Sequence, residues 1–178
     1  MKNSVFIATS LDGFIARADG GLDWLPPDGG EEHGYTAFIA SVDAIVIGRN
    51  TYETVLGFGS WPYAQKQVVV LTTRPAAKPP SGAKVDFMSG APHEIVAQLA
   101  TRGMKHLYID GGVTIQRFLD AGLIQRMTIT TIPVLLGRGI PLFGPVARDI
   151  RLEHVATRTY AGGMVQSEYV VTGGPATA

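Results

Sequence analysis

AIVIGRNTYET, residues 44–54, joins a short β-branched run to a helical pattern through one glycine. The apolar run is too short for a helix, so it predicts a buried strand. Gly48 permits a sharp turn, Asn50 or Thr51 can cap the following helix, and the free N–H groups of its first turn can bind an anion. Arg49 adds a positive charge beside them. The stretch predicts a strand–turn–helix unit with an anion site, or, on the plainer interpretation, a capped helix with a surface arginine.

The same alternation extends in both directions along the chain. Short apolar runs at 5–8, 68–71 and 107–109 predict further buried strands, and helical periodicity predicts helices within 32–42, 93–103 and 113–122. In the first of these helices the apolar face comprises Tyr35, Phe38, Ile39 and Val42. Strands and helices in this order indicate a largely parallel sheet with helices on both faces.

The last third of the chain has a different pattern. Residues 126–136, 151–161 and 164–172 are strand-like, and the AGG sequence at 161–163 predicts a tight hairpin between the last two. We therefore predict a single α/β domain over residues 1–172, three-layered and with antiparallel C-terminal strands. Residues 75–82 are read as a Pro-rich surface loop and 173–178 as a flexible tail.

Composition excludes several classes of function. The 178 residues include 15 Lys and Arg against 15 Asp and Glu, and this zero net charge argues against a nucleic-acid partner. There is no cysteine, which excludes a thiolate nucleophile and Cys-type zinc sites. The four histidines show no metal-ligand spacing, so no metal is expected. No apolar run approaches the length of a membrane span, and we expect a cytoplasmic protein.

Two further strand ends resemble the one at Gly48. The run at 68–71 ends in Thr72, Thr73 and Arg74, and the run at 107–109 leads into Gly111–Gly112 and a helix. Hydroxyls and a guanidinium suit a phosphate monoester, and paired glycines let a diphosphate approach the backbone. Each could be an ordinary loop, but parallel strands end at the same edge of a sheet. Together the three strand ends predict a nucleotide cofactor site.

A long loop at 9–32 follows the first strand. It starts at Ser10, turns at Asp12–Gly13 and carries Trp24, which is typical of a lid over a binding site. Asp12 is also explained as an ordinary turn residue. Asp28, Glu31 and Glu32 precede the first predicted helix, where carboxylates can simply complement the helix dipole.

Read in order, VFIATSLDGFIA, DWLP, DAIVIGRNTYE, VVVLTTRP, LYIDGGVTIQRFL and ITTIPVLLGRGIPLF resemble the dihydrofolate reductase-like superfamily. They are most similar to the branch that includes the C-terminal reductase domain of the bifunctional riboflavin-biosynthesis deaminase/reductase. The resemblance implies a mixed sheet of about eight strands and an NADPH-dependent reductase that transfers hydride to a small heterocycle or sugar. It also implies a homodimer formed through the C-terminal strands.

The resemblance also implies roles for individual residues. Ser10 and Trp24 would contact substrate. The implied cofactor contacts are Gly48, Arg49, Asn50 and Thr51 at the 2′-phosphate and diphosphate, Leu71, Thr72, Thr73 and Arg74 around the adenine, Asp110, Gly111, Gly112, Val113, Thr114 and Ile115 near the diphosphate and nicotinamide, and Ala8 and Ile15 at the nicotinamide ring.

The catalytic acid stays open at this point. Counting back from Gly48 leads to Glu32, counting forward from Trp24 leads to Asp28, and Asp12 is a third candidate. Without cysteines the chain has at most the reductase half, and the helix before residue 44 lacks basic residues for a sugar phosphate. A dihydrofolate reductase-type activity and a non-catalytic NADPH-binding module are the alternatives.

Overall fold

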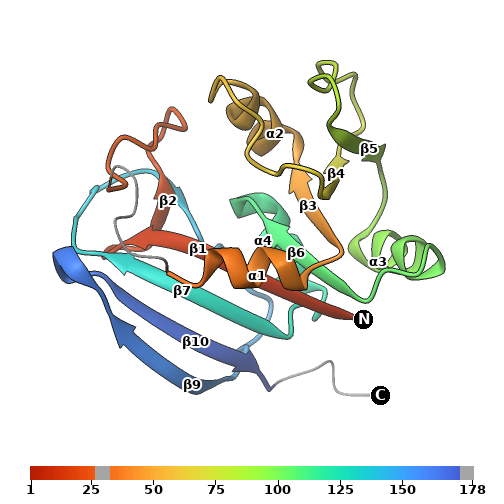
Figure 1. Cartoon of the computed structure of the whole chain (residues 1–178). Coiled ribbons are helices and arrows are strands. Elements are labelled where there is room, and N and C mark those ends of the chain that lie inside the picture. Colours follow the sequence, from red (N-terminus) through yellow and green to blue (C-terminus); the bar gives the residue numbers. More distant parts are fainter. Residues whose placement is uncertain (27–32, 173–178) are drawn as a thin grey trace.

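The computed structural model describes residues 1–26 and 33–172 and contains one large sheet flanked by helices (Figure 1). The strands are β1 (Lys2–Ser10), β2 (Phe14–Ala16), β3 (Ala44–Gly48), β4 (Gln67–Leu71), β5 (Lys84–Met88), β6 (His106–Asp110), β7 (Arg126–Ile132), β8 (Ile140–Pro141), β9 (Leu152–Thr159) and β10 (Val165–Val171). The helices are α1 (Tyr35–Ser41), α2 (Arg49–Leu56), α3 (Pro92–Thr101) and α4 (Gly112–Asp120), and a 3₁₀ turn covers Ala161–Gly163.

The large sheet has eight strands in the order β5-β4-β3-β6-β1-β7-β10-β9. The first six strands of this order run parallel, whereas β10 is antiparallel to both β7 and β9. The predicted three-layer α/β fold with antiparallel C-terminal strands is confirmed. Strands β2 and β8 form a separate two-stranded sheet beside the end of β1.

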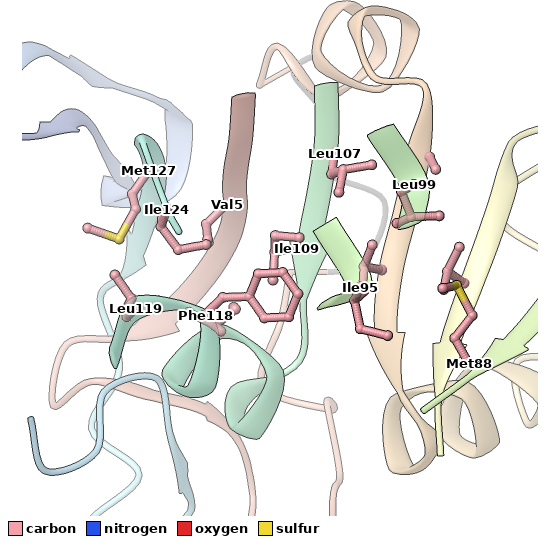
Figure 2. Close-up of a cluster of buried hydrophobic side chains, with 14 of the residues drawn as sticks. Val5, Met88, Ile95, Leu99, Leu107, Ile109, Phe118, Leu119, Ile124 and Met127 are labelled. Atoms are coloured by element: carbon pink, nitrogen blue, oxygen red, sulfur yellow. The ribbon is translucent and has the colours of Figure 1, made fainter. Parts of the chain in front are cut away.

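Helices α3 and α4 cover one face of the sheet. Figure 2 shows Ile95 and Leu99 of α3, and Phe118 and Leu119 of α4, among the buried side chains of the strands. Ile95, Leu99 and Phe118 are 0% exposed, as expected for apolar positions repeating at helical spacing. This core fixes the position at which α4 begins.

Helices α1 and α2 lie on the opposite face and are packed less evenly. Tyr52 and Val55 of α2 are buried in a separate hydrophobic cluster on this face of the sheet. Helix α1 contains no buried residue, so the predicted apolar face of Tyr35, Phe38 and Ile39 is only partly covered. Its main contact is a stacked pair in which the rings of Phe38 and Phe6 lie 4.9 Å apart. Of that predicted face only Val42, just beyond the helix, is buried.

Among residues 1–26 and 33–172, no helix has the length and hydropathy required to span a bilayer. The predicted tail at 173–178 lies outside the described residues.

Candidate functional site

The site begins where three neighbouring strands end. Gly48 of β3 lies opposite Leu71 of β4, and Ile47 of β3 lies opposite Asp110 of β6. The carboxyl ends of these parallel strands therefore form one continuous edge, which is where open α/β sheets bind ligands. The sequence prediction that the three strand ends share an edge is confirmed.

Two helices start at this edge without a side-chain cap. Helix α2 begins at Arg49 directly after Gly48, and α4 begins at Gly112 after Gly111. The prediction that Asn50 or Thr51 caps α2 is wrong, because both residues already lie within the helix. No side chain caps either N-terminus, so first-turn N–H groups of both helices remain available to an anion.

The first turns of α2 and α4 approach each other closely. Gly111 has φ +90°, and a Cβ atom there would collide with the Thr51 hydroxyl. A Cβ atom on Gly48 would lie 3.0 Å from the hydroxyl oxygen of Thr114. The missing Cβ atoms let the Thr51 and Thr114 hydroxyls pack against these glycines, and we call the region where the two helices begin the cradle.

Residues from β1 and β2 border the cradle. A Cβ atom on Gly112 would lie 3.1 Å from Cδ1 of Ile15, so Ile15 packs against the start of α4. Ala8 is partly buried on β1 opposite Thr130. The nicotinamide contacts that the resemblance implies for Ala8 and Ile15 stay a prediction.

Two arginines flank the cradle and differ in their ion pairing. Arg49 donates from Nη1 to Glu53 Oε1 over 2.7 Å, one helical turn away. Arg74 is exposed and has no ion pair within the described part of the chain. Its loop is ordered by Thr72, whose hydroxyl donates to the Arg74 carbonyl (2.9 Å) and accepts from its N–H (3.0 Å).

The remaining predicted cofactor residues differ in accessibility. Thr73 is exposed, Val113 is 67% exposed and Thr114 is 5% exposed. Ile115 is 0% exposed within the core, and its N–H donates to the Gly111 carbonyl at 2.8 Å. Val113 is therefore the accessible side chain of the first turn of α4.

Asp110 ends β6 and directly precedes Gly111 at the cradle. Burial raises its pKa to about 6, against the opposing effect of the Gly111 N–H and the Tyr108 hydroxyl. Burial is the main cause that raises the pKa of Tyr35, to about 12, and that of Tyr63. The nearby charge of Asp110 raises both pKa values further. The sequence assigned Asp110 only a cofactor role; its position at the end of a buried strand was the available signal for a perturbed carboxyl.

Asp12 and Ser10 are engaged in the turn after β1. The Ser10 hydroxyl donates to Asp12 Oδ1 over 2.6 Å and accepts from the Phe14 N–H over 2.9 Å. Asp12 Oδ2 also accepts from the N–H groups of Leu136 (3.1 Å) and Gly137 (2.7 Å). The Ser10 hydroxyl and these N–H groups lower the pKa of Asp12, so its carboxylate is held ionised.

The loop after β2 contributes Trp24, whose buried indole Nε1 has no hydrogen-bond partner in the part of the chain that the structure describes. Asp28, Glu31 and Glu32, the acids discussed from the sequence, lie outside the described residues. Trp61 packs at ring-centroid distances of 6.2 Å from Tyr52 and 5.2 Å from Tyr63, as expected of a structural aromatic. Within residues 1–26 and 33–172 no group of three His, Cys, Asp or Glu side chains is placed to hold a metal ion.

Residues 4–166 match the model of the RibD C-terminal domain family. The chain belongs to this family. It is similar to the Bacillus subtilis protein YwjB, with 36% identity over 95% of this chain and 97% of YwjB. A solved structure from Shewanella sp. PV-4, of a protein provisionally assigned to riboflavin biosynthesis, superposes with a TM-score of 0.90 at 41% identity, covering 97% and 100% of the two chains.

The family fold extends to dihydrofolate reductases. The Enterococcus faecalis dihydrofolate reductase, solved with NADP(H), superposes with a TM-score of 0.69 at 20% identity, covering 97% of each chain. At this identity the similarity concerns the fold alone. The predicted superfamily is confirmed.

Proposed function

We propose that the chain is an NADPH-dependent reductase that acts on a small heterocyclic or sugar-type substrate, similar to 5-amino-6-(5-phosphoribosylamino)uracil reductase. The observation that carries the proposal is the pair of uncapped helix N-termini converging at one sheet edge, in a chain of the RibD C-terminal domain family. Such an edge binds the phosphates of a nucleotide cofactor.

The residues present fit NADPH. The N–H groups of the first turns of α2 and α4 would hold the diphosphate, and the absence of a Cβ at Gly111 lets these two turns approach each other closely. Arg49 and Arg74 would take the 2′-phosphate, where planar guanidinium groups form paired hydrogen bonds. Bound there, NADPH supplies a hydride from its nicotinamide ring.

Asp110 supplies the acid chemistry in this proposal. A carboxyl with a pKa of about 6 is present in both protonation states near neutral pH, and so can donate a proton or orient a polar substrate atom. Asp12 is assigned a positioning role, because its carboxylate is occupied by the Ser10 hydroxyl and by loop N–H groups.

Calorimetric titration with NADPH and NADH tests the cofactor assignment. We expect NADPH to bind more tightly, and the Arg49→Ala/Arg74→Ala double variant to lose most of this preference, by about tenfold or more for the charge-assisted hydrogen bonds removed. The control is Arg102→Ala/Arg151→Ala, which removes the same charge at exposed positions outside the site.

Binding of neither nucleotide would end the reductase proposal. If NADPH binds, its oxidation should be followed with 5-amino-6-(5-phosphoribosylamino)uracil and with dihydrofolate as separate substrates. Turnover of dihydrofolate alone would favour the dihydrofolate reductase-type alternative. Tight binding with no oxidation by any carbonyl, imine or pterin would favour a non-catalytic module.

A further inference from the structure

A second cavity lies away from the cofactor edge, between α1 and the strands β1, β7 and β10. Its volume is about 280 Å³, and its floor includes Ser4 and Thr128. Ser4 lies opposite Arg126 and two residues beyond Lys2, near the amino ends of these parallel strands. Six residues of extended strand separate Ser4 from Ser10, which corresponds to roughly 20 Å at ~3.3 Å per residue. The cavity is therefore distinct from the cofactor edge.

The floor of the cavity is polar although it is buried. Ser4 and Gln166 are each 2% exposed and Thr128 is 9% exposed. Gln166 donates to the His33 carbonyl and to the Thr130 hydroxyl, both over 3.0 Å. The buried Nε2 atom of His33, a residue that also lines the cavity, has no hydrogen-bond partner among residues 1–26 and 33–172. Buried polar groups cost free energy unless they are paired, and here Ser4 pairs with His106 while Gln166 pairs with His33 and Thr130. The floor is therefore a set of polar side chains held in fixed positions.

The rim of the cavity carries excess positive charge. Among the residues that the structure describes, three cationic side chains line it, Lys2, Arg126 and Arg158, against a single carboxylate, Glu168. Glu168 lies 3.3 Å from Arg158 and 3.8 Å from Arg126, so the two guanidinium groups share one partner. Lys2 has no ion pair within residues 1–26 and 33–172. The described part of the lining thus carries three formal positive charges and one negative charge.

His106 forms part of the wall in a fixed orientation. Its Nδ1 lies 3.0 Å from the Ser41 carbonyl oxygen, which can only accept, so Nδ1 carries the proton. Nε2 therefore accepts a hydrogen bond from the Ser4 hydroxyl at 2.9 Å. The ring links the end of α1 to the cavity floor and serves as a natural reporter of events in the cavity.

We propose that this cavity binds a small multivalent anion, namely a metabolite carrying a phosphate or several carboxylates. The anion competes with Glu168 for Arg126 and Arg158 and pairs with Lys2, while the polar floor accepts the remainder of the molecule. The proposal does not depend on the cofactor site or on any catalytic activity.

The test follows the ring signals of His106 by NMR while inorganic phosphate or citrate is added to the full chain, with sodium chloride holding ionic strength constant. We expect a saturable shift that weakens about tenfold or more in the Lys2→Gln/Arg126→Gln variant. The matched control Lys84→Gln/Arg102→Gln removes the same charge outside the cavity and should leave the shift unchanged. Circular dichroism confirms that each variant is folded.

The two probes separate the two ligand chemistries. If only phosphate gives a saturable shift of His106, the ligands of the cavity are phosphorylated molecules. If only citrate does so, the ligands are polycarboxylates. A linear shift, or equal weakening in both double variants, would refute the site, because it would report general surface charge. If instead no anion shifts His106 and the cavity variant alone changes the sedimentation coefficient, the cavity is an interface between copies and the proposal is wrong.

Discussion

Gly111 combines two constraints at one residue. Its φ of +90° disfavours any side chain, and a Cβ atom would also meet the Thr51 hydroxyl. Gly82 has a similar φ of +79° but no atom within 4 Å of a built Cβ, so it isolates the backbone cost.

We expect Gly82→Ala to lower the free energy of unfolding by about 1 kcal/mol, the cost of a left-handed alanine. Gly111→Ala should lower it further and should also abolish NADPH binding, because the two helix N-termini must separate. Urea unfolding and calorimetry measure the two effects. Equal losses of stability in the two variants, with NADPH binding retained, would contradict the close approach of α2 and α4.

Asp110 makes stability depend on pH in an unusual direction for a carboxyl. Its pKa is about 6 in the folded protein and near 3.8 when unfolded. Above pH 6 the folded state is therefore destabilised, because it buries an ionised carboxylate. At pH 7 we expect Asp110→Asn to raise the free energy of unfolding by ~1–3 kcal/mol, following 1.36 kcal/mol per pKa unit.

This gain should shrink as the pH falls from about 6 to 4, because the wild-type carboxyl takes up its proton in the folded state. Urea unfolding at pH 7 and pH 4 provides the comparison, with Asp149→Asn as an exposed control. If Asp110→Asn is destabilising at pH 7, the carboxyl is not held in a desolvating site.

At the scale of elements, Asp12 joins the turn after β1 to the loop after β7. Its carboxylate accepts the N–H groups of Leu136 and Gly137, which lie 124 and 125 residues away in sequence. We expect Asp12→Asn to speed amide hydrogen exchange at these two residues, because a neutral amide offers one acceptor oxygen where the carboxylate offers two.

The protection of the Leu136 and Gly137 amides, measured against their intrinsic exchange rates at the same pH, should also fall in acid. The pKa of Asp12 is lowered by the fold, so the stabilisation is present above the unfolded value of 3.8 and is lost as pH falls through the folded pKa. Asp19→Asn, in the neighbouring loop, is the control. If amide exchange at Leu136 and Gly137 is unchanged in Asp12→Asn, other contacts and not Asp12 anchor the loop.

The elements differ in how far sequence predicted them. The helices over 93–103 and 113–122 formed as predicted, because their apolar positions meet an eight-stranded sheet that buries them. Strand β5 was not predicted, since Lys84 and Asp86 interrupt its apolar residues at the sheet edge. Helix α1 has the right periodicity and packs Phe38 on Phe6, but a cavity with polar residues lies between the helix and the sheet, so its apolar face stays partly open. Periodicity identifies an apolar face and not the surface that covers it.

The candidate site also has features that the sequence predicted and features that it could not predict. Glycines and arginines at strand ends predicted the cradle, because the edge of a parallel sheet follows from local strand–helix order. The pKa of Asp110 could not be predicted, since it depends on burial beside Tyr108 and near Tyr35 and Tyr63, which three separate segments contribute. Sequence places residues along the edge, and tertiary packing sets their chemistry.

At the scale of the whole molecule, the sheet ends at β9, a strand that is exposed along most of its length. Leu152 and Val155 on this strand are 41% and 48% exposed. An open edge strand with apolar side chains pairs readily with another strand. We propose that two chains form a homodimer through β9, with the two sheets joined antiparallel about a two-fold axis.

Sedimentation velocity tests this arrangement. We expect wild-type protein to sediment as a dimer and Leu152→Lys/Val155→Lys to sediment as a monomer, because lysines facing each other across the two-fold axis repel and remain solvated. Val146→Lys is the matched control, since Val146 is also 48% exposed but lies outside β9. A monomeric wild type, or equal dissociation by Val146→Lys, would exclude the edge. Because edge pairing leaves the sheet faces free, a dimer of this kind keeps the cofactor edge open, whereas Arg158 of the anion cavity lies on β9 and therefore at the interface.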